Sequence, residues 1–163
     1  MSSTNPSVLV VCLGNTCRSP LAEAVLQHVA KQRGLNISVD SAGTSGYNTG
    51  KGPNPKTINV CQKYGIPINR VARQISSEDF DQFTYILAAD GSNLANLKRI
   101  QPENSKAEVR LFGSYDDNEP IADPYGGEMS EYEMCYEQCL RYSNKFLDKV
   151  FGTASGNTAA SGV

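Results

Sequence analysis

One stretch near the N-terminus constrains this chain more than any other, because an apolar run leads directly into a short turn and a helix start. Val8–Val11 are apolar without alternation and three of the four are β-branched. Such a run is typical of a strand buried on both faces of a parallel sheet. Ser19 and Pro20 then favour a helix, as its N-cap and first residue. The stretch therefore predicts a strand, a turn from Cys12 to Arg18, and a helix.

The residues of this turn suit an anion. Gly14 and Asn15 are residue types that enter positive φ, so the backbone can curl until successive N–H groups converge. Converging amides and the positive end of a helix favour phosphate and stabilise the Cys12 thiolate, which is the nucleophilic form. Arg18 can grip two phosphate oxygens with its planar guanidinium. We predict a phosphate-binding catalytic loop of Cys12, Leu13, Gly14, Asn15, Thr16, Cys17 and Arg18.

The motif CLGNTCRSP, from Cys12 to Pro20, resembles the signature of the low-molecular-weight protein tyrosine phosphatases. The resemblance implies hydrolysis of phosphotyrosine in proteins, and of small aryl phosphates as an acid phosphatase does. It also implies a phosphocysteine intermediate and no cofactor or metal. The likeness covers roughly residues 7 to 151, with further motifs DSAGTS at 40–45, VARQ at 71–74, YIL at 85–87 and DPY at 123–125.

A phosphatase of this kind needs a carboxylic acid, because a bare phenolate leaves poorly at neutral pH. Pro124 favours Asp123 for this role, since a following proline restricts the backbone and fixes where the side chain points. The resemblance likewise implies that Asp123 is the general acid and then the general base. We interpret Asp116 and Asp117 as a solvated turn. The carboxylates available after the fourth expected strand are Asp116, Asp117, Glu119, Asp123 and Glu128.

Several residues are expected to support the loop. Besides capping a helix, the Ser19 hydroxyl could donate a hydrogen bond to Cys12 when this thiolate becomes the leaving group. The resemblance implies that Ser41 helps to hold Asn15 in a left-handed conformation. The chain departs from the family at Arg70, close to where several relatives carry histidine.

Two further roles come from the resemblance. Asp90 matches the acidic residue that supports Arg18, although an aspartate at a helix start explains it equally well. Tyr47 and Tyr125 match residues that wall the family's cleft and sandwich the substrate ring. A cleft of that depth would favour phosphotyrosine over the shorter phosphoserine.

A second thiol lies in the loop. We expect Cys17 to be held close enough to Cys12 to form a reversible disulfide under peroxide, which would protect the nucleophile from over-oxidation. The alternative is that Cys17 fills a small apolar space. Cys135 and Cys139 are expected to pack on the apolar face of a helix, with no role in metal binding.

Composition narrows the class of protein. A length of 163 residues suits one domain, and a net charge of -2 with a pI near 5.4 argues against a nucleic-acid binder. No apolar run approaches the ~18 residues of a membrane span, and the N-terminal segment lacks the features of a signal peptide. Five cysteines fit reduced thiols better than disulfides. We expect a cytoplasmic monomer or weak dimer without nucleic-acid or membrane partners.

Expected strands alternate with expected helices, which predicts an α/β fold: a doubly wound four-stranded parallel sheet with helices on both faces. The resemblance implies the strand order 2-1-3-4. The final helix is expected to begin with a capping box of Ser130 and Glu133. We divide the chain into an N-terminal extension (1–6), one phosphatase domain (7–152) and a disordered C-terminal tail (153–163).

Three alternatives have different requirements. An arsenate reductase-like thiol relay on the same fold would need more cysteines around residues 80–95, where this chain has none. A non-catalytic phosphotyrosine-binding module would lack Cys12, Arg18 or Asp123, and all three are present. A nucleotide-binding Walker loop would end in Gly-Lys-Ser/Thr, which GNTCRS does not. Phosphoester hydrolysis is therefore the favoured hypothesis, with arsenate reductase-like chemistry as its alternative.

Overall fold

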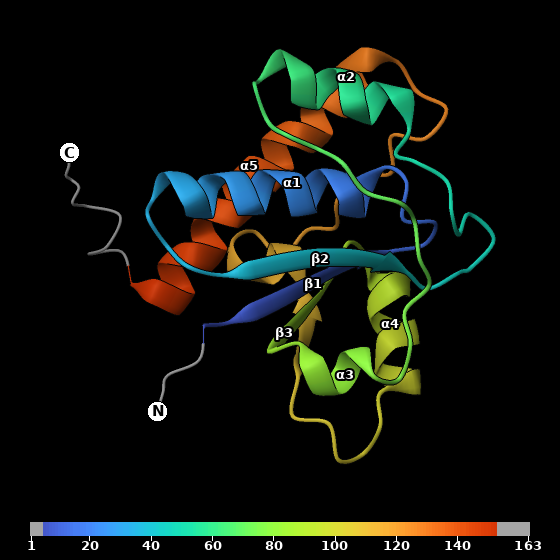
Figure 1. The fold of residues 1–163 in the computed structure, drawn as a ribbon, viewed down its shortest axis with the longest axis vertical. Coiled ribbons are helices and arrows are strands. Elements are labelled where there is room, and N and C mark those ends of the chain that lie inside the picture. The colour runs from blue at the N-terminus through green and yellow to red at the C-terminus, as the bar shows by residue number, and fades with distance from the viewer. Residues whose placement is uncertain (1–4, 153–163) are drawn as a thin grey trace.

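The computed structural model describes residues 5–152, so the expected tail at 153–163 and most of the N-terminal extension lie outside the described residues. It contains a four-stranded, all-parallel sheet in the order β2-β1-β3-β4, which confirms the predicted fold (Figure 1). The elements are β1 (Ser7–Cys12), α1 (Arg18–Gln32), β2 (Ser38–Gly43), α2 (Pro55–Lys63), α3 (Asp79–Gln82), β3 (Tyr85–Ala88), α4 (Gly91–Ile100), β4 (Glu108–Leu111), a 3-10 turn (Phe112–Tyr115) and α5 (Met129–Phe151).

Strand β1 lies in the middle of the sheet, and its position sets that of the predicted loop. Val10 pairs with Ser41 of β2 on one side and with Leu87 of β3 on the other. The chain enters β2 on one side of β1 and β3 on the other, so the strand order switches next to β1. Ligands of open parallel sheets bind at such a point, beyond the carboxyl ends of the strands. Cys12, the last residue of β1, lies at that edge.

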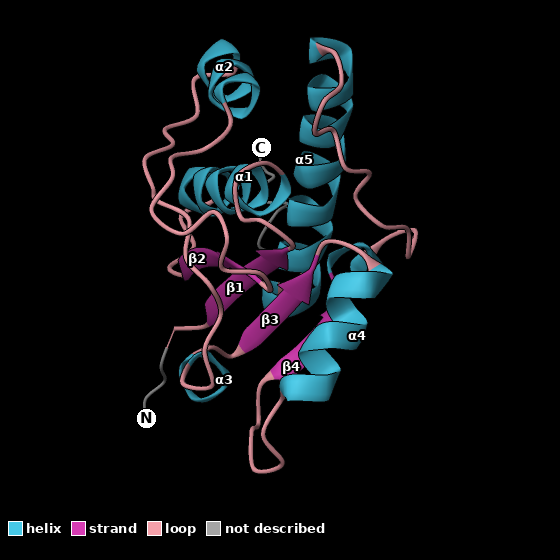
Figure 2. Cartoon of the chain, turned by 90° about the vertical axis from the view of Figure 1, so that its right-hand side faces the viewer, coloured by secondary structure: helices cyan, strands magenta, loops and turns pink. Residues whose placement is uncertain are grey.

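The sheet is covered on both faces (Figure 2). Helices α1, α2 and α5 lie on one side, and α3 and α4 on the other. Val8 and Val10 pack toward the first group and Leu9 and Val11 toward the second, and none of the four is exposed. The alternation follows from the period of two in a strand, and burial of both sets explains why the run reads as continuously apolar.

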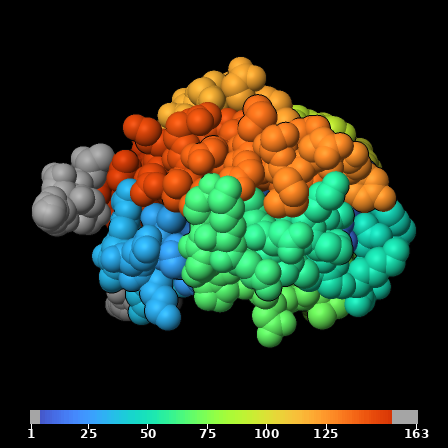
Figure 3. Space-filling view, turned by 90° about the horizontal axis from the view of Figure 1, so that it is seen from above, coloured from blue at the N-terminus to red at the C-terminus, as the bar shows by residue number. Residues whose placement is uncertain are grey.

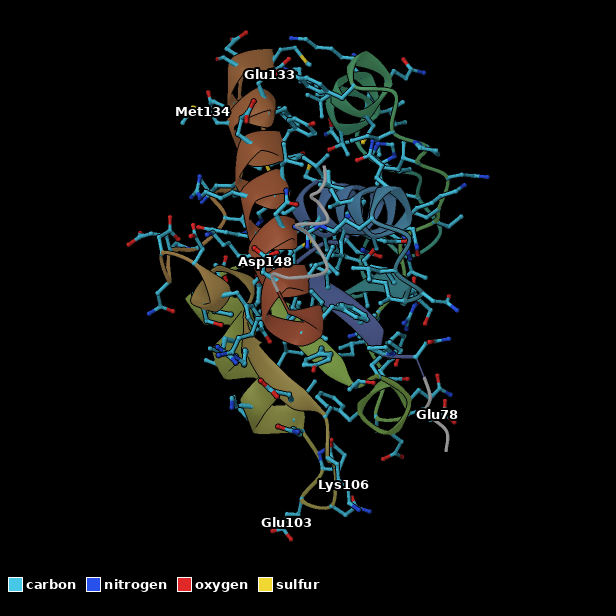
Figure 4. The ribbon with its side chains drawn as sticks, turned by 90° about the vertical axis from the view of Figure 1, so that its left-hand side faces the viewer. Glu78, Glu103, Lys106, Glu133, Met134 and Asp148 are labelled. Atoms are coloured by element: carbon cyan, nitrogen blue, oxygen red, sulfur yellow. The ribbon has the colours of Figure 1, made fainter. Side chains whose placement is uncertain are left out.

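Helix α5 ties the first layer together. The side chain of Arg33, just after α1, donates to Asp148 at 2.9 Å and to Asn144 at 2.7 Å. Tyr64, at the end of α2, stacks on Tyr136 with ring centroids 4.0 Å apart, and α2 and α5 lie side by side on the surface in Figure 3. Glu133 lies near one end of α5 and Asp148 near the other (Figure 4). Within residues 5–152, no helix is both long and apolar enough to cross a membrane.

The start of α1 differs from the prediction. The helix begins at Arg18, Cys17 occupies the N-cap position, and no side chain there makes a capping hydrogen bond. Ser19 is already inside the helix. Its hydroxyl lies 3.0 Å from the Cys12 sulfur and accepts a hydrogen bond from Asn15 at 2.8 Å. The expectation that Ser19 caps the helix is therefore wrong, because its hydroxyl is engaged in the loop.

The start of α5 is also different. The helix begins at Met129, and its capping box consists of Glu128 and Glu131 in place of Ser130 and Glu133. Glu133 instead accepts hydrogen bonds from the Lys63 ammonium and the Tyr64 hydroxyl, both at 2.6 Å. This carboxylate connects α5 to the end of α2, so it does not reach back to the helix terminus.

Candidate active site

The loop from Cys12 to Arg18 surrounds a buried sulfur. Cys12 is only 3% exposed, and its Sγ accepts a hydrogen bond from the backbone N–H of Asn15 at 3.2 Å. The Ser19 hydroxyl is the second polar contact of this sulfur. Asn15 has a φ of +58°, the left-handed conformation that brings its N–H inward. Two hydrogen-bonding groups therefore converge on the sulfur and fix its position in the loop.

Asn15 is held in this conformation by its own side chain. Its Nδ2 donates to Ser19 at 2.8 Å and to Ser41 at 3.0 Å, and its Oδ1 accepts from the backbone N–H of Arg73 at 3.0 Å. The side chain is buried, so these bonds satisfy groups that water cannot reach. The expected contact between Asn15 and Ser41 is present.

An ion-pair network behind Ser41 was not foreseen. The Ser41 hydroxyl donates to Glu23 at 2.7 Å, and Arg70 Nη1 binds Glu23 at 2.6 Å and Asp40 at 2.7 Å. Burial raises the pKa of Glu23. Burial also disfavours the Asp40 carboxylate, but the hydrogen bond from Arg70 and other contacts outweigh this effect and lower the pKa of Asp40. Glu23 is the only carboxylate in α1. This isolated acidic residue was the one sequence feature that could have indicated an ion pair here.

Arg18 is buried and joined to several parts of the site. Its Nη1 donates to Asp90 at 2.7 Å and to the Ile121 carbonyl at 3.2 Å, and its Nε lies 3.9 Å from Asp123. Asp90 also caps α4, because its side chain accepts a hydrogen bond from Asn93 N–H at 2.8 Å. The contact with Arg18 and the position at a helix start, which were considered as alternatives, therefore occur together. Burial opposes the charge on Arg18, but the hydrogen bond to Asp90 raises its pKa overall.

Asp123 also lines the cavity and is more open to water than Arg18. Its side chain is 53% exposed, and Oδ1 accepts from the backbone N–H of Tyr125 at 3.1 Å. The preceding residues are fixed by Gln138 of α5, which donates to the Pro120 carbonyl at 2.9 Å and accepts from Ala122 N–H at 3.4 Å. Its backbone is therefore anchored next to Arg18, while the carboxylate remains in contact with solvent.

The other carboxylates after β4 do not line the cavity. Asp116 and Asp117 bind Arg141 at 2.7 and 2.8 Å, and Asp117 also accepts from the Tyr142 hydroxyl at 2.6 Å. This last bond is the main reason that the pKa of Asp117 is lowered. The two residues therefore form an exposed turn, as predicted, and this turn is paired with α5.

The loop forms the floor of a cavity of about 450 Å³. Tyr47 and Tyr125 lie on its rim, 69% and 73% exposed, whereas Cys12 is buried. The reactive sulfur is therefore at the bottom and the aromatic rings are at the entrance. Asn48, whose Nδ2 donates to the Gly14 carbonyl at 3.3 Å, and Lys51 also line the wall and were not predicted.

The second thiol of the loop, Cys17, is 6% exposed and also lines the cavity. Its Sγ lies 3.6 Å from the Tyr132 hydroxyl of α5. Burial raises the pKa of Cys17. Cys135 and Cys139 are buried in the layer of α1, α2 and α5, as expected from packing, and Cys61 is buried in the same layer.

Comparison with known proteins agrees with this geometry. Residues 7–154 match the family model described as low molecular weight phosphotyrosine protein phosphatase. A Homo sapiens protein of that name is 47% identical over 88% of this chain and 94% of its own length, and one from Saccharomyces cerevisiae is 41% identical with the same coverage. The solved structure of a Drosophila arginine phosphatase has a TM-score of 0.83 and 37% identity over 87% of this chain and 96% of that one. The chain therefore belongs to the low molecular weight phosphotyrosine protein phosphatase family, which confirms the family, the fold and the class of enzyme, a protein tyrosine phosphatase.

Proposed function

We propose that this phosphatase hydrolyses phosphotyrosine in proteins through a phosphocysteine intermediate, with Cys12 as the nucleophile. The observation that carries the proposal is the convergence of Asn15 N–H and the Ser19 hydroxyl on a buried sulfur in the same cavity as Arg18 and Asp123. Such contacts hold the nucleophilic sulfur in position before substrate arrives. The loop amides and Arg18 would hold the three equatorial oxygens of the phosphoryl group as charge shifts among them.

In the first step, Cys12 attacks phosphorus in line and the ester bond to the phenolic oxygen breaks. Asp123, in its protonated form, gives that oxygen a proton. Its carboxyl lies 3.9 Å from Arg18 Nε and lines the same cavity as Cys12. The product tyrosine then diffuses away and the phosphoryl group stays on sulfur.

In the second step, water hydrolyses the phosphocysteine. Asp123 is now ionised and takes a proton from the attacking water, so the same carboxyl acts as acid and then as base. Cys12 is the leaving group, and the Ser19 hydroxyl, 3.0 Å from Sγ, can donate a hydrogen bond to the thiolate as it forms.

The shape of the cavity supports an aryl phosphate as substrate. The sulfur lies deep, while Tyr47 and Tyr125 on the rim and the half-exposed Leu13 offer apolar surface to a ring. A phosphoserine side chain is too short to bring its phosphate to the floor while its backbone stays outside. We therefore propose phosphotyrosine and small aryl phosphates as the preferred substrates.

We further propose that Cys17 is a redox partner of Cys12. Both thiols line the cavity and neither is in a disulfide. Peroxide would convert the Cys12 thiolate to a sulfenic acid, and attack by Cys17 would then give a disulfide that thiols can reduce. An enzyme with five reduced cysteines suits the cytoplasm, and we propose that it acts there as a monomer or weak dimer.

The central experiment compares a phosphotyrosine peptide with p-nitrophenyl phosphate in the presence of EDTA. Cys12→Ser should lose essentially all turnover on both. Asp123→Ala should lose about 10²- to 10⁴-fold on the peptide but much less on p-nitrophenyl phosphate, whose leaving group needs no proton. Asp117→Ala, in the paired turn against α5, serves as the control and should retain wild-type turnover.

Four outcomes would overturn parts of this proposal. Full activity of Cys12→Ser would exclude the phosphocysteine route. Equal losses of Asp123→Ala on the two substrates would remove Asp123 as the acid. Faster turnover of a phosphoarginine peptide than of the phosphotyrosine peptide would make this chain resemble the Drosophila arginine phosphatase in substrate as well as in fold, and arsenate-dependent thiol oxidation would favour the reductase alternative.

A further inference from the structure

The proposed mechanism makes no use of the buried hydroxyl of Tyr132, which lies against the loop. This residue lies in the first turns of α5, and its Oη is 3.6 Å from Cys17 Sγ, although the two residues are 115 positions apart in the chain. Both side chains are buried, at 1% and 6% exposure. Among residues 5–152, Cys17 is the only hydrogen-bond partner of this hydroxyl.

The Tyr132 ring is held in place from several sides. The capping box of Glu128 and Glu131 fixes the first turn of α5. Lys56, at the start of α2, donates to the Gly127 carbonyl at 2.7 Å, and its ammonium lies 6.0 Å from the centre of the Tyr132 ring. Helices α2 and α5 lie side by side where they meet (Figure 3). Contacts at the starts of α2 and α5 therefore hold the Tyr132 ring so that its hydroxyl lies next to Cys17.

The groups around Cys17 act on its thiol in opposite directions. Burial disfavours the thiolate most, and the nearby Asp123 carboxylate and Cys12 thiolate disfavour it further. The hydroxyl of Tyr132, and more weakly that of Thr16 at 4.0 Å, favour it. Burial raises the pKa of Tyr132, so this hydroxyl keeps its proton and can donate it in a hydrogen bond to sulfur.

We propose that Tyr132 is a positioning residue that prepares Cys17 to react with oxidised Cys12. The inference rests on the proposed redox role of Cys17 and names the residue that governs it. Hydrogen peroxide transfers one oxygen to the Cys12 thiolate, its O–O bond breaks, hydroxide leaves, and Cys12 becomes a sulfenic acid. The Cys17 thiolate then attacks the sulfenic sulfur, a disulfide forms, the S–O bond breaks, and the departing hydroxide takes up a proton.

The test follows the fate of Cys12 in Tyr132→Phe, which keeps the ring and removes only the hydroxyl. Samples treated with hydrogen peroxide are alkylated at set times, and mass spectrometry measures the Cys12–Cys17 disulfide and the Cys12 sulfinic acid. We expect the disulfide to form about 3- to 10-fold more slowly than in wild type, because a smaller share of Cys17 is thiolate. More of the enzyme should therefore reach the sulfinic acid, which dithiothreitol does not reverse.

A matched control is available on the same helix. Tyr136→Phe also removes the hydroxyl of a buried tyrosine from α5, but that ring stacks on Tyr64, and within residues 5–152 its hydroxyl makes no hydrogen bond to a thiol. It should form the disulfide at the wild-type rate. Turnover of p-nitrophenyl phosphate before oxidation should stay within about twofold of wild type in both variants.

A second measurement separates electrostatic positioning from packing. In a Cys12→Ser background, the rate at which methyl methanethiosulfonate modifies Cys17 is followed against pH, with and without Tyr132→Phe. Loss of the hydroxyl should move this profile to higher pH, which a change in packing alone would not do.

The possible failures are distinct. If wild type forms no Cys12–Cys17 disulfide under peroxide, the redox role of Cys17 is wrong and this inference falls with it. If wild type forms the disulfide and Tyr132→Phe forms it equally fast with an unchanged Cys17 profile, the redox role stands and the role of Tyr132 is overturned.

Discussion

The nucleophile loop and the Asp123 segment of the cavity are built in opposite ways. On the nucleophile side, the Cys12 sulfur, Asn15 and Arg18 are all at most 5% exposed. Hydrogen bonds and ion pairs from β2, α4 and the segment before α3 hold them. On the acid side, Asp123 is half exposed, and its carboxylate has the Tyr125 N–H and the more distant Arg18 as its partners. One side is fixed before substrate arrives, and the other remains in contact with water.

The difference fits the two chemical tasks. A nucleophilic thiolate and a phosphate clamp work best when their donors are preorganised in a site that excludes water. In the proposed mechanism, Asp123 has to release a proton to the phenol and then accept one from water, so contact with solvent serves it. Substitutions on the buried side should therefore affect both catalysis and stability, and those on the exposed side should affect catalysis or binding alone.

The largest effect is expected from Arg18→Lys. Lysine keeps the positive charge but loses the planar pair of donors and the simultaneous contact with Asp90 and the Ile121 carbonyl. We expect kcat/KM for the phosphotyrosine peptide to fall about 10³-fold, equivalent to about 4 kcal/mol of transition-state stabilisation. Arg141→Lys, in an exposed ion pair with Asp116, should show no loss. If Arg18→Lys also shows no loss, charge alone is what matters at position 18.

Arg70→Gln should mainly lower stability. It removes the cation that binds Glu23 and Asp40, and the Arg70 and Glu23 side chains are only 10% and 21% exposed. Breaking such a pair leaves a poorly compensated carboxylate, for which we expect a loss of about 2–3 kcal/mol in the free energy of unfolding, measured in urea at neutral pH. The matching removal of an exposed pair, Arg141→Gln, should cost less than about 1 kcal/mol. Equal losses would show that the network behind Ser41 has no special energetic role.

Much of this arrangement could be predicted from the sequence, because its signals are local. The unbroken apolar run Val8–Val11 indicated a central parallel strand, and the loop chemistry of Cys12 to Arg18 follows from neighbouring residues. The strand order and the cavity walls came from family resemblance. The network of Glu23 and Arg70 could not be foreseen, since it joins residues from separate elements that meet only after the sheet forms.

The two wrong helix starts have a related cause. Ser19 and Ser130 have good capping chemistry when only their neighbours in sequence are considered. In the folded chain the Ser19 hydroxyl lies against the Cys12 sulfur, and Glu133, the expected partner of Ser130, binds Lys63 and Tyr64. At both helix starts, tertiary contacts replace the capping hydrogen bonds that the local sequence predicts. Tyr132 escaped notice for the same reason, because only the fold brings α5 to the loop.

A smaller effect concerns acid stability. Burial disfavours the Asp90 carboxylate, but the N–H of Asn93 and the side chain of Arg18 outweigh burial and lower its pKa. Asp90 therefore adds stability above the unfolded pKa of about 3.9, and this stability is lost as the pH falls through the lower folded value. Asp90→Asn should cost about 1–2 kcal/mol at pH 7 and lose less stability on acidification below about pH 4 than wild type does. Parallel stability curves for the two proteins across that range would contradict the assignment.

The smallest effect on stability is expected at the exposed rim of the cavity. The rim residues differ most from the buried loop in their contact with solvent. Tyr47→Ala removes a ring that is 69% exposed, so the free energy of unfolding should change by less than about 0.5 kcal/mol. The ring should matter only when a substrate ring covers it, and we expect KM for the phosphotyrosine peptide to rise about 3- to 10-fold with kcat nearly unchanged. Inorganic phosphate, which has no ring, should inhibit the variant and wild type equally. Weaker inhibition by phosphate would mean that Tyr47 also shapes the loop, and the division between a fixed floor and an independent rim would have to be abandoned.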